Sequence, residues 1–449
     1  MFPITDQELR ELMSRHNINN ITDATIRQIA SLAGTLEMKT GEQVVHLEIG
    51  NPGIPANALG VEAEREVLRK GIANQYPNIS GIPQLKENAS RFIKAYLNIE
   101  LPGSCVIPTV GSMQGGYAAM LLCAHRDPKK DTMLFINPGF PAQRYQAKLI
   151  GLKEESFDIY NYRGKALEAK LEEYFSKGNI TAMIYSTPNN PAWINLTDEE
   201  LEIIGRMATK YDVIIMEDLA YLGMDFRNNF GTPGVAPFVP SVANYTDNYI
   251  LFLSASKIFS YAGQRIAITC FSPAVAERVC PELQNFFGMP TMIGAFVFGV
   301  LYALSSGTAH SAQHAFATML GAAADGRLNF VEDCREYERR GGLAKEIFTS
   351  NGFHIVYDKD GNKDISDGFF FTAGYGNMTS EQLQEALLRY GVAAISLPGT
   401  GSEQDGLRVC VSMIKNDAEF EILRKRLAAF NADHASEFKK ECPAKACAL

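Results

Sequence analysis

The chain has 449 residues, a length that allows two domains or one large domain with a smaller one. Hydrophobic residues make up 46% of the sequence and charged residues 21%, which is typical of a globular protein with a sizeable core. The net charge of -9 argues against nonspecific binding to nucleic acid, which requires a basic surface.

Targeting, membrane and metal signals are weak. The first ten residues lack the basic and apolar regions of a secretory signal peptide. The longest apolar run, 293–304, is too short and too rich in glycine to cross a bilayer, so a core helix is the better interpretation. The cysteines show no paired spacing, and His310 and His314 lack the acidic residue of a zinc motif. We therefore expect a cytoplasmic protein with reduced thiols, no metal site and no membrane partner.

Hydrophobic periodicity predicts the order of helices and strands. Helical spacing covers 5–33, a strand is expected at 44–49, and helices follow at 57–70 and 84–97. Short apolar runs then alternate with amphipathic stretches. The runs predict strands at 105–109, 132–136, 181–186, 212–217, 249–254 and 266–271, with helices between them at 113–124, 142–150, 165–176 and 198–210. Such alternation is typical of βαβ units, whose mostly parallel sheet is buried on both faces.

Beyond residue 310 the pattern changes to α+β. A long polar helix over 312–350 is expected first, followed by strands at 352–357, 368–373, 392–396 and 406–412 and by helices at 379–390 and 416–430. We therefore predict an α/β fold with a large domain, 51–310, around a mostly parallel sheet of the seven-stranded type flanked by helices. Residues 1–50 and 311–432 would form a smaller α+β domain, and 433–449 a disordered tail.

The stretch from Ser254 to Arg265 contains the most informative lysine. It follows the apolar run 249–253, and it reads Ser-Ala-Ser-Lys-Ile-Phe-Ser-Tyr-Ala-Gly-Gln-Arg. The amine of Lys257 can form a Schiff base with an aldehyde, while Ser254 and Arg265 are suited to hold a phosphate beside it. Pyridoxal 5'-phosphate (PLP) combines an aldehyde with a phosphate. Taken alone, the stretch favours a solvated surface lysine, because most lysines are solvated surface charges.

Polar and aromatic side chains also follow the other predicted strands, where α/β folds bind ligands. Gly111, Ser112 and Met113 open a helix whose amides suit a phosphate, although a plain glycine turn is the alternative. Phe140, in a Pro/Gly turn, could stack on a heteroaromatic ring or belong to the core. Asn190 could donate to a ring hydroxyl or simply stand in a tight turn.

Asp218 ends a buried strand, in the sequence Glu-Asp-Leu-Ala-Tyr that closes with Tyr221. A buried carboxylate is costly unless it meets a cation. A pyridinium N–H is such a cation, and the carboxylate would keep it protonated so that the ring accepts electrons. A helix cap or an ordinary ion pair is the alternative.

Together, and in this order, these pieces resemble the class I and II aminotransferases, which are fold-type I PLP enzymes. The resemblance covers residues 47–410. Its matching segments are Tyr76 to Gly81, Gly111-Ser112-Met113, Pro138-Gly139-Phe140, Asn189-Asn190-Pro191, Asp218 to Tyr221, Ser254 to Arg265 and Leu407-Arg408-Val409. The Asp-x-x-Tyr, Ser-x-x-Lys and Lys-x₇-Arg patterns are its specific part.

The resemblance implies roles around the cofactor ring. Lys257 would bind the cofactor as a Schiff base and then move the substrate proton. Asp218 would pair with the pyridine nitrogen. Tyr221 and Asn190 would bind the ring hydroxyl, and Phe140 would stack on the ring.

The resemblance also implies a phosphate site and a substrate site. Arg408 would bind the α-carboxylate of the substrate as a bidentate fork, aided by the amide of Gly50. The homodimer of the family shares its active sites between subunits. The phosphate would be held by the amides of Ser112 and Met113, by the side chains of Ser254 and Arg265, and by Tyr76 from the neighbouring subunit.

Some positions depart from the family pattern. The usual Asn-Pro-Thr-Gly reads Asn190-Pro-Ala-Trp193, with the single tryptophan of the chain in place of glycine, and Phe140 stands where tyrosine or tryptophan is commoner. No second arginine can be assigned to a side-chain carboxylate, so dicarboxylic specificity is not supported. Cis peptide bonds are expected at Asn137-Pro138 and Asn190-Pro191.

The reaction expected from the resemblance is transfer of an amino group between an amino acid and a 2-oxo acid. A PLP-dependent lyase or decarboxylase on the same scaffold would use the same cofactor contacts and stays open. A PLP-binding regulator is a remote alternative, because the segment before the first strand is short and not basic.

Overall fold

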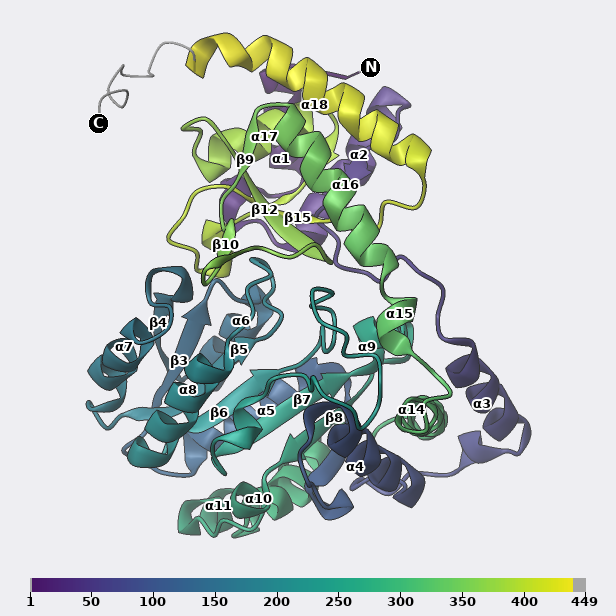
Figure 1. Cartoon of the computed structure of the whole chain (residues 1–449), viewed down its shortest axis with the longest axis vertical. Helices are drawn as coiled ribbons and strands as arrows, with labels where there is room; N and C mark the ends of the chain where they lie inside the picture. Colours follow the sequence, from purple (N-terminus) through teal and green to yellow (C-terminus); the bar gives the residue numbers. More distant parts are fainter. Residues whose placement is uncertain (1, 439–449) are drawn as a thin grey trace.

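The computed structural model describes residues 2–438 and arranges them in two lobes (Figure 1). The larger lobe, drawn lower in the figure, contains a seven-stranded sheet in the order β2-β8-β7-β6-β5-β3-β4. The strands are β2 (Val106–Val110), β3 (Thr132–Asn137), β4 (Lys153–Asp158), β5 (Ile180–Ser186), β6 (Ile214–Asp218), β7 (Tyr249–Ser254) and β8 (Ile266–Phe271). Strands β3 to β7 are parallel, and β8 is antiparallel to both neighbours. The predicted α/β fold with a mostly parallel sheet is confirmed.

Helices cover the large sheet because its strands are apolar on both faces. Every residue of β3, β6, β7 and β8 is buried. Strand β4 is the one that the hydrophobic pattern did not predict, since it lies at the sheet edge and begins with exposed Lys153 and Glu154. The helices that follow successive strands are α5 (Gly111–His125), α6 (Pro141–Ile150), α7 (Ala166–Phe175) and α8 (Asp198–Tyr211).

The smaller lobe, drawn above, contains an antiparallel sheet in the order β14-β15-β12-β9. These strands are β9 (Phe353–Ile355), β12 (Phe370–Tyr375), β14 (Ile395–Ser396) and β15 (Leu407–Cys410). Near the chain start, β1 (Val45–His46) pairs in parallel with β13 (Val392–Ala393). The helices of this lobe are α1 (Asp6–Arg15), α2 (Ile26–Thr40), α17 (Ser380–Arg389) and α18 (Asp417–Phe438). Both ends of the described chain therefore lie in the small lobe (Figure 1).

The prediction of a single long helix over 312–350 is wrong. The segment forms α14 (His310–Ala324), α15 (Phe330–Asp333) and α16 (Glu336–Ser350). Alanine-rich α14 packs on α4 (Pro83–Leu97) in the large lobe, where the Asn88 amide and the Tyr96 hydroxyl each donate to an α14 carbonyl at 2.9 Å. The core of the large lobe includes Tyr337, whereas Ala344 belongs to the core of the small lobe. By packing, the chain therefore changes lobe within α16 rather than at the expected boundary near 310.

The tail expected to be disordered from residue 433 is helical as far as Phe438, because α18 continues to that residue. Two contacts explain the extension. The Tyr390 hydroxyl donates to Asp433 at 2.6 Å, and the His434 ring stacks on Phe430 with centroids 4.4 Å apart. The rest of the expected tail, 439–449, lies outside the described residues.

Two further expectations concern the backbone and the bilayer. The peptide bonds Asn137-Pro138 and Asn190-Pro191 are both cis, as predicted. Over residues 2–438, no helix has the length and apolar character needed to cross a bilayer.

Trp193 is fully buried beneath the inter-lobe cavity described below. Its ring lies edge-on to Tyr221 and Phe370, with centroids 5.5 and 6.1 Å away. Gly368 lies against the other part of the indole, because a Cβ atom at Gly368 would be 2.2 Å from the indole ring. The large side chain at 193 therefore depends on the absence of a side chain at 368.

We predict that Gly368→Ala lowers the stability of the protein by about 1–3 kcal/mol, because the added methyl overpacks the indole. The free energy of unfolding from urea denaturation measures this change. Gly34→Ala in α2 is the control, since a Cβ there meets no atom within 4 Å. Adding Trp193→Phe to Gly368→Ala should restore part of the loss. An additive double variant would show that the two residues do not constrain each other.

Candidate active site

A cavity of about 1300 Å³ lies at the carboxyl ends of β5, β6 and β7 and is closed on its other side by residues of the small lobe. All predicted site residues except Tyr76 line this cavity. They are Gly50, Ser112, Met113, Phe140, Asn190, Asp218, Tyr221, Ser254, Lys257, Arg265 and Arg408. Segments from distant parts of the sequence thus meet in one space.

Lys257 follows β7 in the short helix α9 (Ala255–Ile258), which Ser254 caps by accepting from the amide of Ser256 at 3.1 Å. The Lys257 amine donates to the carbonyl of Gly50. Burial, together with the nearby charges of Arg408 and Arg265, lowers the pKa of Lys257 to about 8. A lowered pKa increases the fraction of neutral, nucleophilic amine at neutral pH.

Asp218 and Tyr221 lie at and just after the end of β6. The Asp218 carboxylate accepts from the amide of Ala220 at 3.2 Å and from the side chain of Gln143 at 3.1 Å. Burial raises the pKa of Asp218 to about 6, although these two hydrogen bonds act in the opposite direction. Burial also raises the pKa of Tyr221 well above its usual value of 10. A cationic N–H beside Asp218 would lower its pKa and hold the carboxylate ionised.

The start of α5 and the side chain of Arg265 form an anion-binding cradle. No side chain caps α5, and the Ser112 hydroxyl is buried without a hydrogen-bond partner among the described residues. Gly111 has φ +67°, and a Cβ there would lie 2.4 Å from the Arg265 guanidinium, so glycine is needed for the close approach. Uncapped amides, a free hydroxyl and a guanidinium are suited to a phosphate.

Arg408, on β15, approaches the same cavity from the small lobe. Its side chain is buried, one terminal nitrogen donates to the carbonyl of Glu48, and its centre lies 5.1 Å from the Phe370 ring centroid. Its Nε is buried and has no hydrogen-bond partner within residues 2–438. Burial lowers the pKa of Arg408 below its usual value. A buried guanidinium with an unused donor is suited to bind a carboxylate.

Two adjacent asparagines in the loop after β5, Asn189 and Asn190, have different surroundings. The Asn189 side chain donates to the carbonyl of Pro138 at 2.8 Å and accepts from the amide of Ala192 at 2.9 Å, so it holds two loops together. The Asn190 side chain lines the cavity instead. Phe140, directly before α6, lines it from the neighbouring loop.

Tyr76 is the predicted site residue that the single chain does not bring to the cavity. Its side chain is 93% exposed. Sequence reasoning also missed Gln143, Phe370 and seven residues of the segment 22–30, all of which line the cavity. The position of Gln143, one turn after Phe140 on a predicted helix, was an available signal. The segment 22–30 reads only as amphipathic helix, so nothing in its pattern indicates the site.

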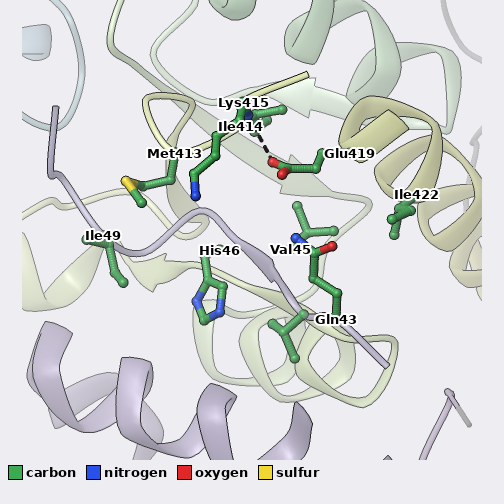
Figure 2. Close-up of a pocket in the computed structure, with 10 residues that line it drawn as sticks. Gln43, Val45, His46, Ile49, Met413, Ile414, Lys415, Glu419 and Ile422 are labelled. Carbon is green, nitrogen blue, oxygen red and sulfur yellow. Dashed lines mark hydrogen bonds between the residues drawn. The ribbon is translucent and has the colours of Figure 1, made fainter. Parts of the chain in front are cut away.

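A second cavity, of about 260 Å³, lies between the segment around β1 and the start of α18 (Figure 2). His46 borders it, and the contact of its ring with Glu48 at 2.7 Å raises the pKa of His46. The Lys415 amide donates to Glu419 at 2.9 Å across its rim (Figure 2). Ile49 borders both cavities. The smaller cavity holds none of the predicted site residues, so the larger one is the candidate active site.

Glu217 precedes Asp218 but faces the protein interior. Its carboxyl group accepts from the Tyr185 hydroxyl at 3.0 Å, from the Val242 amide at 3.2 Å and from the Ser241 hydroxyl. Burial raises the pKa of Glu217 from 4.5 to about 7. Because the folded-state pKa is the higher one, this group stabilises the fold fully below pH 4.5 and loses that contribution as the pH rises through 7.

We predict that Glu217→Gln removes this pH dependence. Between pH 5 and pH 8 the wild type should lose about 2 kcal/mol more unfolding free energy than the variant. Urea denaturation of both proteins at the two pH values measures the difference. Parallel stability profiles for the two proteins would contradict the assigned protonation of Glu217.

The chain is similar to known proteins over most of its length. Residues 42–427 match the family model "Aminotransferase class I and II". The chain is 23% identical to LL-diaminopimelate aminotransferase of Natranaerobius thermophilus over 411 residues, which cover 90% of this chain and 96% of that protein. It is 29% identical to glutamate-pyruvate aminotransferase AlaC of Escherichia coli over 235 residues, which cover 51% of this chain and 54% of that one.

The fold is also found among solved structures. A double mutant of Thermus thermophilus aspartate aminotransferase superposes with a TM-score of 0.74 at 19% identity, covering 93% of this chain and 98% of the other. At this identity the likeness shows the fold. The family match, in contrast, extends from the strand before Gly50 to α18 and includes both lobes. The chain belongs to the class I and II aminotransferases.

Proposed function

We propose that this chain is a PLP-dependent aminotransferase that moves an amino group between an amino acid and a 2-oxo acid. The observation that carries the proposal is the convergence of Lys257, Asp218 and Arg408 on one cavity. An amine of lowered pKa, a buried carboxyl group and a buried guanidinium are the groups that this reaction requires. The family of the chain supports the same reaction.

The residues present fit the cofactor. Lys257 would hold its aldehyde carbon, Asp218 its ring nitrogen, and Arg265 with Ser112 its phosphate. Two observations support this fit: the Ser112 hydroxyl has no hydrogen-bond partner among the described residues, and Gly111 leaves space beside Arg265. When bound, PLP supplies a ring that accepts the electron pair left at the substrate α-carbon.

The side chains of this chain would then divide the work. Arg408 orients the substrate through its α-carboxylate. The amine of Lys257, whose pKa of about 8 lies near neutral pH, would take the proton from the substrate α-carbon and deliver it to the carbon of the cofactor's aldehyde group. Asp218 would keep a proton on the ring nitrogen, and Tyr221 and Asn190 would bind the ring hydroxyl.

We predict that Lys257→Ala abolishes transamination and the visible absorption of lysine-bound cofactor, while some PLP remains bound through the phosphate cradle. Absorption spectra and borohydride trapping of purified protein measure both effects. Lys94→Ala, at an exposed site on α4, is the control. Wild-type protein is assayed with a panel of amino acids and with pyruvate, 2-oxoglutarate or glyoxylate as acceptor. Carbon dioxide or ammonia released without an acceptor would instead indicate a decarboxylase or a lyase.

We also propose a homodimer with shared active sites. The surface of the large lobe around α11 (Pro281–Phe287), η7 (Ala295–Leu301) and α13 (Tyr302–Leu304) exposes large apolar side chains, which typically mark an interface. These are Phe286, Phe298, Tyr302 and Leu304, whose exposed fractions are 61%, 57%, 63% and 48%. The exposure of Tyr76 agrees with a role in the neighbouring subunit.

A mixing experiment tests the shared site. Tyr76→Ala should weaken PLP binding by about tenfold, because a hydrogen bond to a charged group is lost. Co-refolding inactive Lys257→Ala subunits with Tyr76→Ala subunits should produce hybrid dimers in which one site has both intact residues. Activity above that of either parent is expected at limiting PLP. A mixture that matches the sum of its parents, or an active monomer in sedimentation, would contradict the proposal.

A further inference from the structure

The large cavity has one cation that the proposed function does not use. Its charged lining residues are Asp23, Arg27, Asp218, Lys257, Arg265 and Arg408. The last four have roles toward the cofactor or the α-carboxylate. Asp23 and Arg27 come from the N-terminal segment, which packs on the small lobe and forms part of the cavity wall.

Arg27 is the second residue of α2, which is capped by Thr25 and begins at Ile26. Reciprocal hydrogen bonds between Thr25 and Gln28, at 3.0 and 3.3 Å, fix the geometry of this first turn. The turn contains no acidic residue, and the exposed Arg27 guanidinium makes no ion pair or hydrogen bond within residues 2–438. A cation is electrostatically disfavoured at the N-terminal end of a helix. Arg27 therefore stands in an unfavourable position that no ion pair or hydrogen bond from the described residues compensates.

Asp23 does not supply that compensation, since it forms no ion pair with Arg27 among the described residues. Its carboxylate lies two residues before the cap, near the positive end of α2, which stabilises a negative charge. The dipole of α2 thus stabilises the negative charge of Asp23 and destabilises the positive charge of Arg27. An anionic group of a ligand would compensate the positive charge of Arg27 at this part of the cavity wall.

Two arginines of the small lobe therefore face the cavity. Arg408 is buried at 2% exposure, whereas Arg27 is exposed at the outer wall. The cavity of about 1300 Å³ is larger than a typical ligand pocket of 300–1,000 Å³, so it has room for a substrate side chain beyond the α-carboxylate. We propose that Arg27 binds a second carboxylate of the substrate, so that the enzyme uses acidic amino acids and dicarboxylic 2-oxo acids. This inference rests on the proposed function.

Binding of substrate-like acids tests the role of Arg27 directly. Calorimetric titration of the PLP-loaded protein compares glutarate, which has two carboxylates, with butyrate, which has one. The wild type should bind glutarate about 10- to 100-fold more tightly, since a charged hydrogen-bonded partner contributes that much. Arg27→Gln should remove this preference, and high salt should reduce it because the guanidinium is exposed. Arg10→Gln, an exposed arginine of α1 outside the cavity, is the matched control.

Kinetics with glutamate and glutamine, which have nearly the same shape, distinguishes a loss of specificity from a general structural effect of the substitution. Arg27→Gln should lower kcat/KM for glutamate by about 10- to 100-fold, mainly through KM, while the value for glutamine stays unchanged. Equal losses for both donors would overturn the proposal, as would a glutarate preference that persists in Arg27→Gln. A preference for ornithine that Asp23→Asn removes would also overturn it. Absence of turnover with every donor would count against the proposed function, and the titrations would still decide the role of Arg27.

Discussion

The segment Glu48–Gly53 is the constraint on which the site depends. Two cations of the candidate site, Lys257 and Arg408, come from different lobes, and each donates to a carbonyl of this segment, at Gly50 and Glu48. The far end is anchored by Arg340, which donates to the carbonyl of Gly53 at 3.4 Å and to the carbonyl of Ser412 at 2.6 Å. A Cβ at Gly53 would lie 1.6 Å from that carbonyl oxygen, so no other residue fits there. The spacing of the two cations is therefore set by one stretch of backbone.

Two adjacent carboxyl groups at the end of β6 lie in different environments, one in the protein interior and one at the cavity. Glu217 and Asp218 are neighbours at the end of β6, where successive side chains point to opposite faces. Glu217 turns inward and its oxygens are occupied by the hydroxyl and amide donors around Tyr185 and Val242. Asp218 turns to the cavity and keeps capacity for a ligand. Burial raises the pKa of both groups. Of these two groups, Asp218 is the one whose ionised form a cation bound in the cavity could stabilise.

Much of this organisation was predictable because it depends on local patterns. Buried parallel strands are continuous apolar runs, and the residues after them necessarily meet at one edge, so Lys257, Asp218 and Asn190 could be grouped from their positions alone. Strand β4 could not be found, because an edge strand needs little apolar character. The break of 312–350 into three helices and the extension of α18 depend on tertiary contacts such as those of Asn88 and Asp433. Arg27 and Gln143 were missed because their place at the cavity follows from how elements pack.

Trp193 gives the molecule an optical property. It is the single tryptophan of the sequence, and it lies one ring away from the cavity, in contact with Tyr221. Its indole N–H is buried and has no hydrogen-bond partner among the described residues, an environment that shifts indole emission to short wavelength. Tryptophan emission therefore reports on a single location beside the candidate site, and energy transfer to an absorbing ring bound there would quench that emission. The substitution that departs from the family pattern makes occupancy of the site visible without a label.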